Sequence, residues 1–87
     1  MEWPERYAAE LAAAAGEELS LSKREEAIVL RLAREVAHRT DDRKNAPVAS
    51  YLVGRFVAAR VRAGAGPGEA LDEAIAIAER LLPPPAE

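Results

Sequence analysis

Hydrophobic and polar positions alternate with the period of an α-helix in four separate segments of the chain. The first segment has apolar side chains spaced by three or four residues, namely Trp3, Tyr7, Leu11 and Ala14. This spacing gathers them on one side of a helix. We expect this helix over residues 4–15, because Pro4 suits a first helical turn and Gly16 suits a helix end.

The second segment begins with a recognisable capping sequence. Ser22 and Glu25 are spaced as in a capping box, in which each side chain accepts a hydrogen bond from an unpaired N–H at the helix start. The helix is expected over residues 23–39. Its apolar face comprises Ile28, Val29, Leu32, Ala33, Val36 and Ala37. Glu35 and Arg39 are four residues apart with the acid first, which favours an ion pair along the helix.

The third segment has apolar residues on two sides. Asn45 is the expected N-cap and Pro47 fits the first turn, which predicts a helix over residues 46–63. One face comprises Val48, Tyr51, Leu52, Phe56 and Ala59, and a second side comprises Ala49, Val53, Val57 and Val61. So wide an apolar surface predicts either the most buried helix of the set or one that buries a second side against another protein.

A glycine-rich break at residues 64–68 separates the third segment from the fourth. Helical spacing then returns over residues 69–82, in Leu71, Ala74, Ile75, Ala78, Leu81 and Leu82. Three prolines end it. Because no segment shows the alternation of a strand, the sequence predicts an all-α, compact four-helix domain over residues 1–82 and a proline-rich tail over residues 83–87.

Composition and charge exclude several classes of function. The 87 residues include no cysteine, so disulfides and cysteine-ligated zinc are excluded. Basic and acidic residues are interleaved and the net charge is −3, which argues against a nucleic-acid partner. No apolar run approaches the roughly 20 residues that span a bilayer, and the first residues do not resemble a secretory signal. A cytoplasmic location without membrane association is expected.

No set of residues indicates catalysis. His38 is the only histidine and falls on the charged side of its helix, so a metal site would need carboxylates around a single imidazole. No serine lies in a nucleophile motif, and adjacent acidic residues on a helix point in different directions. We therefore expect no enzyme activity, no catalytic or metal-binding residue and no cofactor.

One cluster of basic residues has the form of an anion site. Its members are the basic residues Arg39, Arg43 and Lys44, together with the neighbouring amide residue Asn45. They lead into the start of the third helix, where free N–H groups and the helix dipole favour an anion. A phosphate is the ligand that this arrangement predicts. Two aspartates in the same loop offset the charge, so an ordinary charged loop is the competing interpretation.

Several stretches resemble a known family. They are Leu32 to Arg39, Ala46-Pro47 and Tyr51 to Gly54, together with Trp3 near the start and the closing amphipathic helix. The family comprises short helical domains of unknown function in bacteria, found alone or attached to molybdenum-cofactor guanylyltransferases. The resemblance implies an accessory role near molybdopterin-guanine dinucleotide synthesis, with such a guanylyltransferase as partner. It supplies no catalytic residues.

Two departures from the family pattern stand out. The loop before Ala46 carries Arg43-Lys44-Asn45 in place of a more apolar approach, and the third helix continues through residues 56–61, which could add a contact surface. The leading hypothesis is a non-catalytic accessory or interaction module with a protein partner or a second copy of the chain. The alternative is a binding domain for a small anionic ligand, either a phosphate or, as the resemblance implies, a pterin nucleotide.

Overall fold

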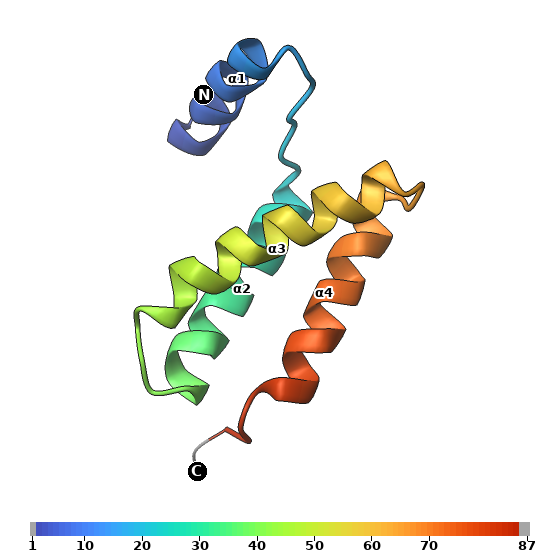
Figure 1. The fold of residues 1–87 in the computed structure, drawn as a ribbon. Coiled ribbons are helices and arrows are strands. Elements are labelled where there is room, and N and C mark those ends of the chain that lie inside the picture. The colour runs from blue at the N-terminus through green and yellow to red at the C-terminus, as the bar shows by residue number, and fades with distance from the viewer. Residues whose placement is uncertain (1, 86–87) are drawn as a thin grey trace.

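The chain forms four α-helices in a computed structural model that describes residues 2–85 (Figure 1). The helices are α1 (Trp3–Ala15), α2 (Lys23–Arg39), α3 (Asn45–Arg62) and α4 (Pro67–Leu81). No strand occurs between residues 2 and 85, and the predicted all-α four-helix domain is confirmed. The division into residues 1–82 and a tail of 83–87 stays a prediction, and residues 1, 86 and 87 lie outside the described part.

The predicted ends of α1 and α2 are confirmed by their capping contacts. The Ser22 hydroxyl accepts a hydrogen bond from the Glu25 N–H at 3.1 Å, and Glu25 Oε1 accepts one from the Ser22 N–H at 2.8 Å. Gly16 ends α1 with a φ of 67°, a left-handed conformation that a side chain would strain. These contacts involve only residues close in sequence.

Two helix starts differ from the prediction. Helix α4 begins at Pro67, two residues early, because proline has no N–H to leave unpaired in a first turn. Asn45 is the first residue of α3, and its side chain does not cap the helix. It donates instead to the Thr40 hydroxyl at 2.9 Å, while the Lys44 N–H donates to Asp42 Oδ1 at 2.9 Å. The loop therefore satisfies its own polar groups.

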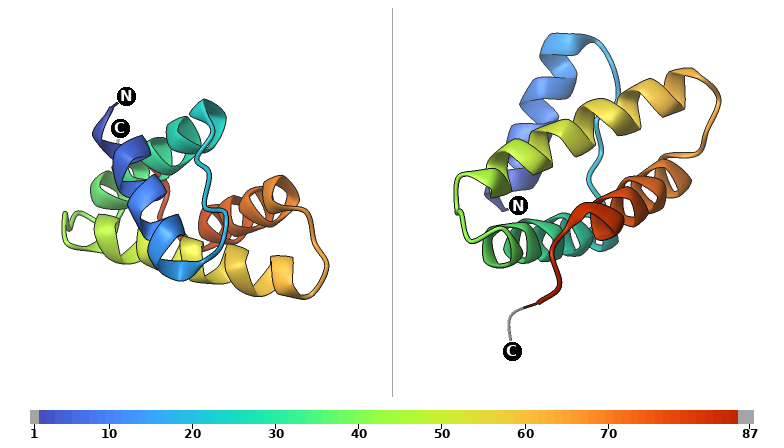
Figure 2. Two further views of the ribbon diagram at one scale, coloured as in Figure 1. Left: turned by 90° about the horizontal axis from the view of Figure 1, so that it is seen from above. Right: turned by 60° about the horizontal axis from the view of Figure 1, so that its bottom comes forward.

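Three of the helices pack into one body. Helix α3 crosses over α2 and α4 and packs against both (Figures 1 and 2). The buried core residues are Leu32 and Val36 of α2 and Ala70, Leu71 and Ala74 of α4. Ion pairs between exposed side chains join α4 to its neighbours, from Arg24 to Asp72 at 3.4 Å and from Arg60 to Glu73 at 3.0 Å.

Of the two alternatives for α3, the one that makes it the most buried helix is wrong, and burial of a second side against another protein stays a prediction. None of its residues is buried, whereas α4 has three buried residues. The reason is its position as an outer layer: only the side that faces α2 and α4 is covered. This side is half-buried and comprises Ala49, Ser50, Val53, Phe56 and Val57.

Helix α1 stands apart from this three-helix body (Figures 1 and 2). It packs against none of the other helices and is joined to them by residues 16–22. As a result the radius of gyration is 13.9 Å, compared with about 12 Å expected for a compact chain of this length.

Within residues 2–85, no helix has both the length and the apolar character needed to cross a membrane.

Candidate functional site

Helix α1 presents a row of large apolar side chains to solvent. Trp3, Tyr7 and Leu11, here called the α1 stripe, are 67%, 51% and 41% exposed. The Trp3 and Tyr7 rings stack with centroids 4.9 Å apart. Their spacing of four residues places them one above the other on the helix. The stripe was predicted from the sequence, but it packs against no other helix.

Contacts on the other side of α1 set the direction of the stripe. Residues 18–21 lie on that side and, with Ala8, Ala9 and Ala12, line an open hollow of about 380 Å³. The Lys23 ammonium lies 3.4 Å from Glu2 and 3.6 Å from Glu5, which links the start of α1 to the start of α2. Glu2, followed by Glu26 and Glu5, raises the pKa of Lys23 above its usual value.

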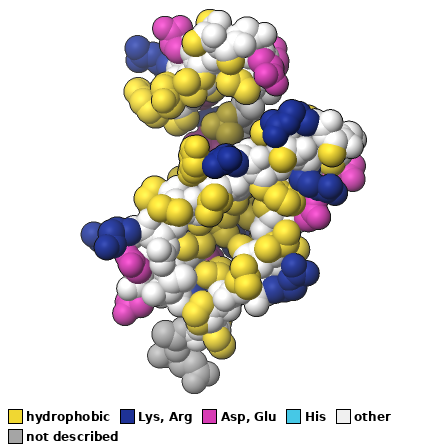
Figure 3. Space-filling model, viewed as in Figure 1, with side chains coloured by type: hydrophobic (Ala, Val, Ile, Leu, Met, Phe, Trp, Pro, Cys, Tyr) yellow, Lys and Arg dark blue, Asp and Glu magenta, His cyan; other side chains and the backbone are white. Residues whose placement is uncertain are grey.

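A second apolar surface lies on the outer side of α3. Val48, Tyr51 and Leu52, here called the α3 patch, are 58%, 66% and 56% exposed. The Arg55 guanidinium lies over the Tyr51 ring at 5.8 Å from its centroid, a cation–π contact. In Figure 3 hydrophobic side chains gather on the lower side of α1 and along α3. Two apolar surfaces on different helices are therefore open to solvent.

Two of the four predicted anion-binding residues have side chains bonded to other groups of the chain. The Arg39 side chain is only 9% exposed; it pairs with Glu35 at 3.5 Å and Glu79 at 2.7 Å and donates to the Pro83 carbonyl at 2.7 Å. The Asn45 side chain is bonded within the loop, as described above. Arg43 and Lys44 have exposed side chains. Anion binding stays a prediction that rests on these two residues.

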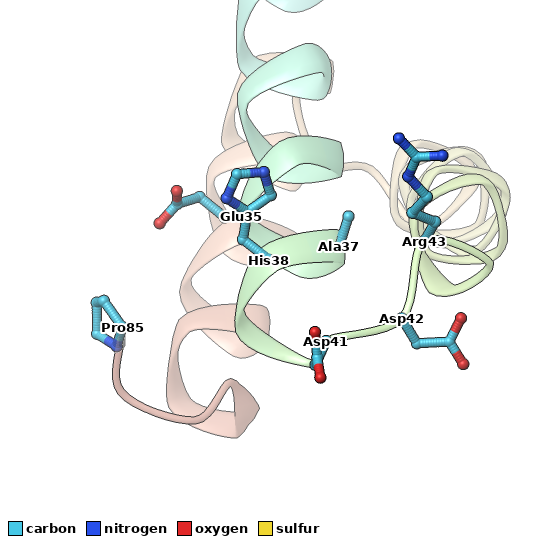
Figure 4. Close-up of a pocket in the computed structure, with 7 residues that line it drawn as sticks. All are labelled: Glu35, Ala37, His38, Asp41, Asp42, Arg43 and Pro85. Atoms are coloured by element: carbon cyan, nitrogen blue, oxygen red, sulfur yellow. The ribbon is translucent and has the colours of Figure 1, made fainter. Parts of the chain in front are cut away.

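An open hollow of about 620 Å³ lies beside Arg43 (Figure 4). Its lining residues are Glu35, Ala37, His38, Asp41, Asp42, Arg43 and Pro85. The His38 ring lies near Glu35, and the Asp41 and Asp42 side chains point in different directions. Among residues 2–85 no three His, Cys, Asp or Glu side chains are grouped to hold a metal ion. Three carboxylates around one guanidinium also make the hollow unfavourable for an anion.

Comparison with protein families matches residues 1–86 to a domain of unknown function (DUF6457). The chain belongs to this family. The expectation of a small helical domain of unknown function is thus confirmed, because the match covers all four helices. No curated protein and no solved structure is significantly similar to the chain.

For this family member, the sequence predicted two apolar sides of α3 but not which of them packs inward. The side with Val48, Tyr51 and Leu52 is exposed, whereas Ala49, Val53 and Val57 lie on the side that faces α2 and α4. A usable signal was present in the residue types. Trp, Tyr and Arg are enriched at protein interfaces, and Trp3, Tyr51 and Arg55 are among the exposed side chains.

Proposed function

We propose that the chain is a non-catalytic protein-interaction module that binds through the α1 stripe and the α3 patch. The observation that carries the proposal is the exposure of six large apolar side chains on two helices. A single exposed leucine needs no explanation, but grouped apolar side chains on the surface are typical of protein interaction sites. Trp3, Tyr51 and Arg55 are also of the types that contribute most to binding energy at interfaces.

The hydroxyl groups support a structural role over a catalytic one. Thr40 Oγ1 donates to the Val36 carbonyl at 2.6 Å, and Ser50 Oγ donates to the Ala46 carbonyl at 3.0 Å. The Ser22 hydroxyl caps α2. Each of these three hydroxyl groups, the potential nucleophiles, forms a hydrogen bond with a backbone group three or four residues away. None is oriented by a neighbouring base, as nucleophilic catalysis would require.

A more specific proposal concerns the biological setting. The resemblance of residues 32–39 and 51–54 to helical domains attached to molybdenum-cofactor guanylyltransferases supports an accessory role in molybdopterin-guanine dinucleotide synthesis. In that role the module would bind the guanylyltransferase. Calorimetry with a purified guanylyltransferase from the same cell tests this setting separately, since absence of heat would remove this partner and leave the interaction module in place.

Affinity capture tests the module itself. The tagged chain is compared with a Trp3→Ala/Tyr51→Ala variant and with Leu81→Ala, which removes a leucine that is 79% exposed at the far end of α4. We expect the parent chain and Leu81→Ala to retain stoichiometric protein, either a second copy or another chain, and the double variant to lose it. Equal retention by all three proteins, or a monomer with no bound protein, would contradict the proposal.

A further inference from the structure

We infer that the partner of this surface is a second copy of the chain, with α1 of each copy packed on α3 of the other. The inference rests on the proposed function, because it names the occupant of the same surface. Each chain carries both apolar surfaces. In a symmetric pair the α1 stripe of each copy can cover the α3 patch of the other, so the same contact forms twice. Charge, area and the position of α1 each support this arrangement.

The two elements carry opposite charge. Residues 2–18, which contain α1, include five glutamates and a single arginine, and three of the glutamates remain after Glu2 and Glu5 pair with Lys23. Helix α3 contains three arginines and no acidic residue. Arg60 is already paired with Glu73, whereas Arg55 lies within the α3 patch, in contact with Tyr51. An acidic amphipathic helix and a basic apolar patch are complementary, and this favours their association in one orientation.

The exposed area is large enough for a stable pair. The accessible surface of the chain is 6715 Å², compared with about 5,000 Å² expected for a compact protein of 9.4 kDa. The excess is about 1,700 Å² per chain, and standard protein interfaces bury about 800 Å² on each partner. The excess is therefore larger than the area that each partner buries in a standard interface.

The position of α1 leaves the α1 stripe uncovered by α3 of its own chain. Lys23 links Glu2 and Glu5 to the start of α2, and the connection occupies the Ala8 and Ala12 side of the helix. In this position α1 is not packed on α3 of its own chain. The stripe is therefore available to α3 of a second copy, and a closed twofold pair forms the same contact twice.

Mixing of two variants tests the arrangement. Tyr7→Asp damages the α1 stripe and Leu52→Asp damages the α3 patch; both residues are exposed, so both variants should fold, as circular dichroism verifies. By light scattering we expect the parent chain to have twice its mass of 9.4 kDa and each variant to be a monomer. An equimolar mixture should regain the double mass, because a mixed pair keeps one undamaged contact between α1 and α3.

Two controls make the result specific. Leu81→Asp, outside both surfaces, should leave the double mass unchanged. A chain with both Tyr7→Asp and Leu52→Asp, mixed with the parent chain, should form no mixed pair, because each contact then has one damaged side. Closure of α1 on its own α3 predicts no rescue by any mixture.

Failure of the second-copy inference can be distinguished from failure of the proposed function. A parent chain that is monomeric over about a hundredfold range of concentration, but captures another protein through Trp3 and Tyr51, overturns the second copy as occupant and leaves the proposed function standing. A monomer that captures nothing overturns both. If the parent chain is a dimer and neither Tyr7→Asp nor Leu52→Asp changes its mass, the assignment of the interface to α1 and α3 is wrong.

Discussion

Arg39 shows how far a single residue can be interpreted from the sequence. Its ion pair with Glu35 was predicted because the two residues are four apart on one helix, and the structure confirms it at 3.5 Å. Its shorter contacts, with Glu79 and the Pro83 carbonyl, join residues 40 and 44 positions apart. Sequence spacing does not predict contacts between residues so far apart. The sequence therefore could not show that the Arg39 side chain, predicted to bind an anion, is bonded to other groups of the chain.

We expect Arg39→Ala to lower the free energy of unfolding by about 1 to 2 kcal/mol, since it removes charged hydrogen bonds whose acceptors are partly solvated. Arg39→Lys should recover only part of the loss, because an ammonium cannot reproduce the guanidinium's paired geometry. Urea denaturation measures both. Arg34→Ala, at an exposed position of the same helix, should stay within about 0.5 kcal/mol, and an equal effect of the two alanine variants would contradict the structural role of Arg39.

At the scale of elements, the helices themselves were largely predictable. Their apolar spacing and local signals such as Ser22 and Gly16 depend on neighbours within one or two turns. The partner of each apolar face was not predictable, because it depends on how the connections direct the helices. The seven residues between α1 and α2 leave the α1 stripe in solvent, and α3 lies across its neighbours with one side uncovered.

The link between α1 and α2 should depend on the charge of Lys23. Because the pKa of Lys23 is raised in the folded state, chiefly by Glu2, its stabilising effect is complete below its usual pKa of about 10.4 and is lost as the pH rises through the raised value. Trp3 is the only tryptophan, so its fluorescence anisotropy reports on α1. We expect the anisotropy to fall at high pH in the parent chain and in Lys44→Gln.

Lys23→Gln should show the lower anisotropy already at neutral pH, with a smaller change above it. The same aromatic residues are present in all three proteins, so the difference between them isolates the lysine at position 23. An identical titration of Lys23→Gln and the parent chain would show that this contact does not hold α1.

At the scale of the whole molecule, the chain consists of a small three-helix body and one helix beside it. The body has only five buried apolar residues, on α2 and α4. The core of a domain of this size rarely supplies more than roughly 3 to 5 kcal/mol of stability. Burial of the α1 stripe and the α3 patch against a second copy would therefore add appreciably to the stability of the folded chain.

Loss of one core side chain should be severe. Leu71 is 4% exposed, and we expect Leu71→Ala to cost about 2 to 5 kcal/mol, enough to unfold much of the protein at low concentration. Leu30→Ala removes a leucine that is 63% exposed and should change the stability by less than about 0.5 kcal/mol. Thermal melts followed by circular dichroism compare them. Similar melting temperatures for the two variants would contradict the assignment of the core.

The most direct test of the account is the emission wavelength of Trp3 in the purified chain as its concentration is raised. Trp3 is 67% exposed in the single chain, so it should emit like an indole in water at high dilution. We predict a shift to shorter wavelength as α1 packs on a second copy, and a shift displaced to higher concentration in Arg55→Glu. Emission that stays at the wavelength of an exposed indole at every concentration would contradict the account.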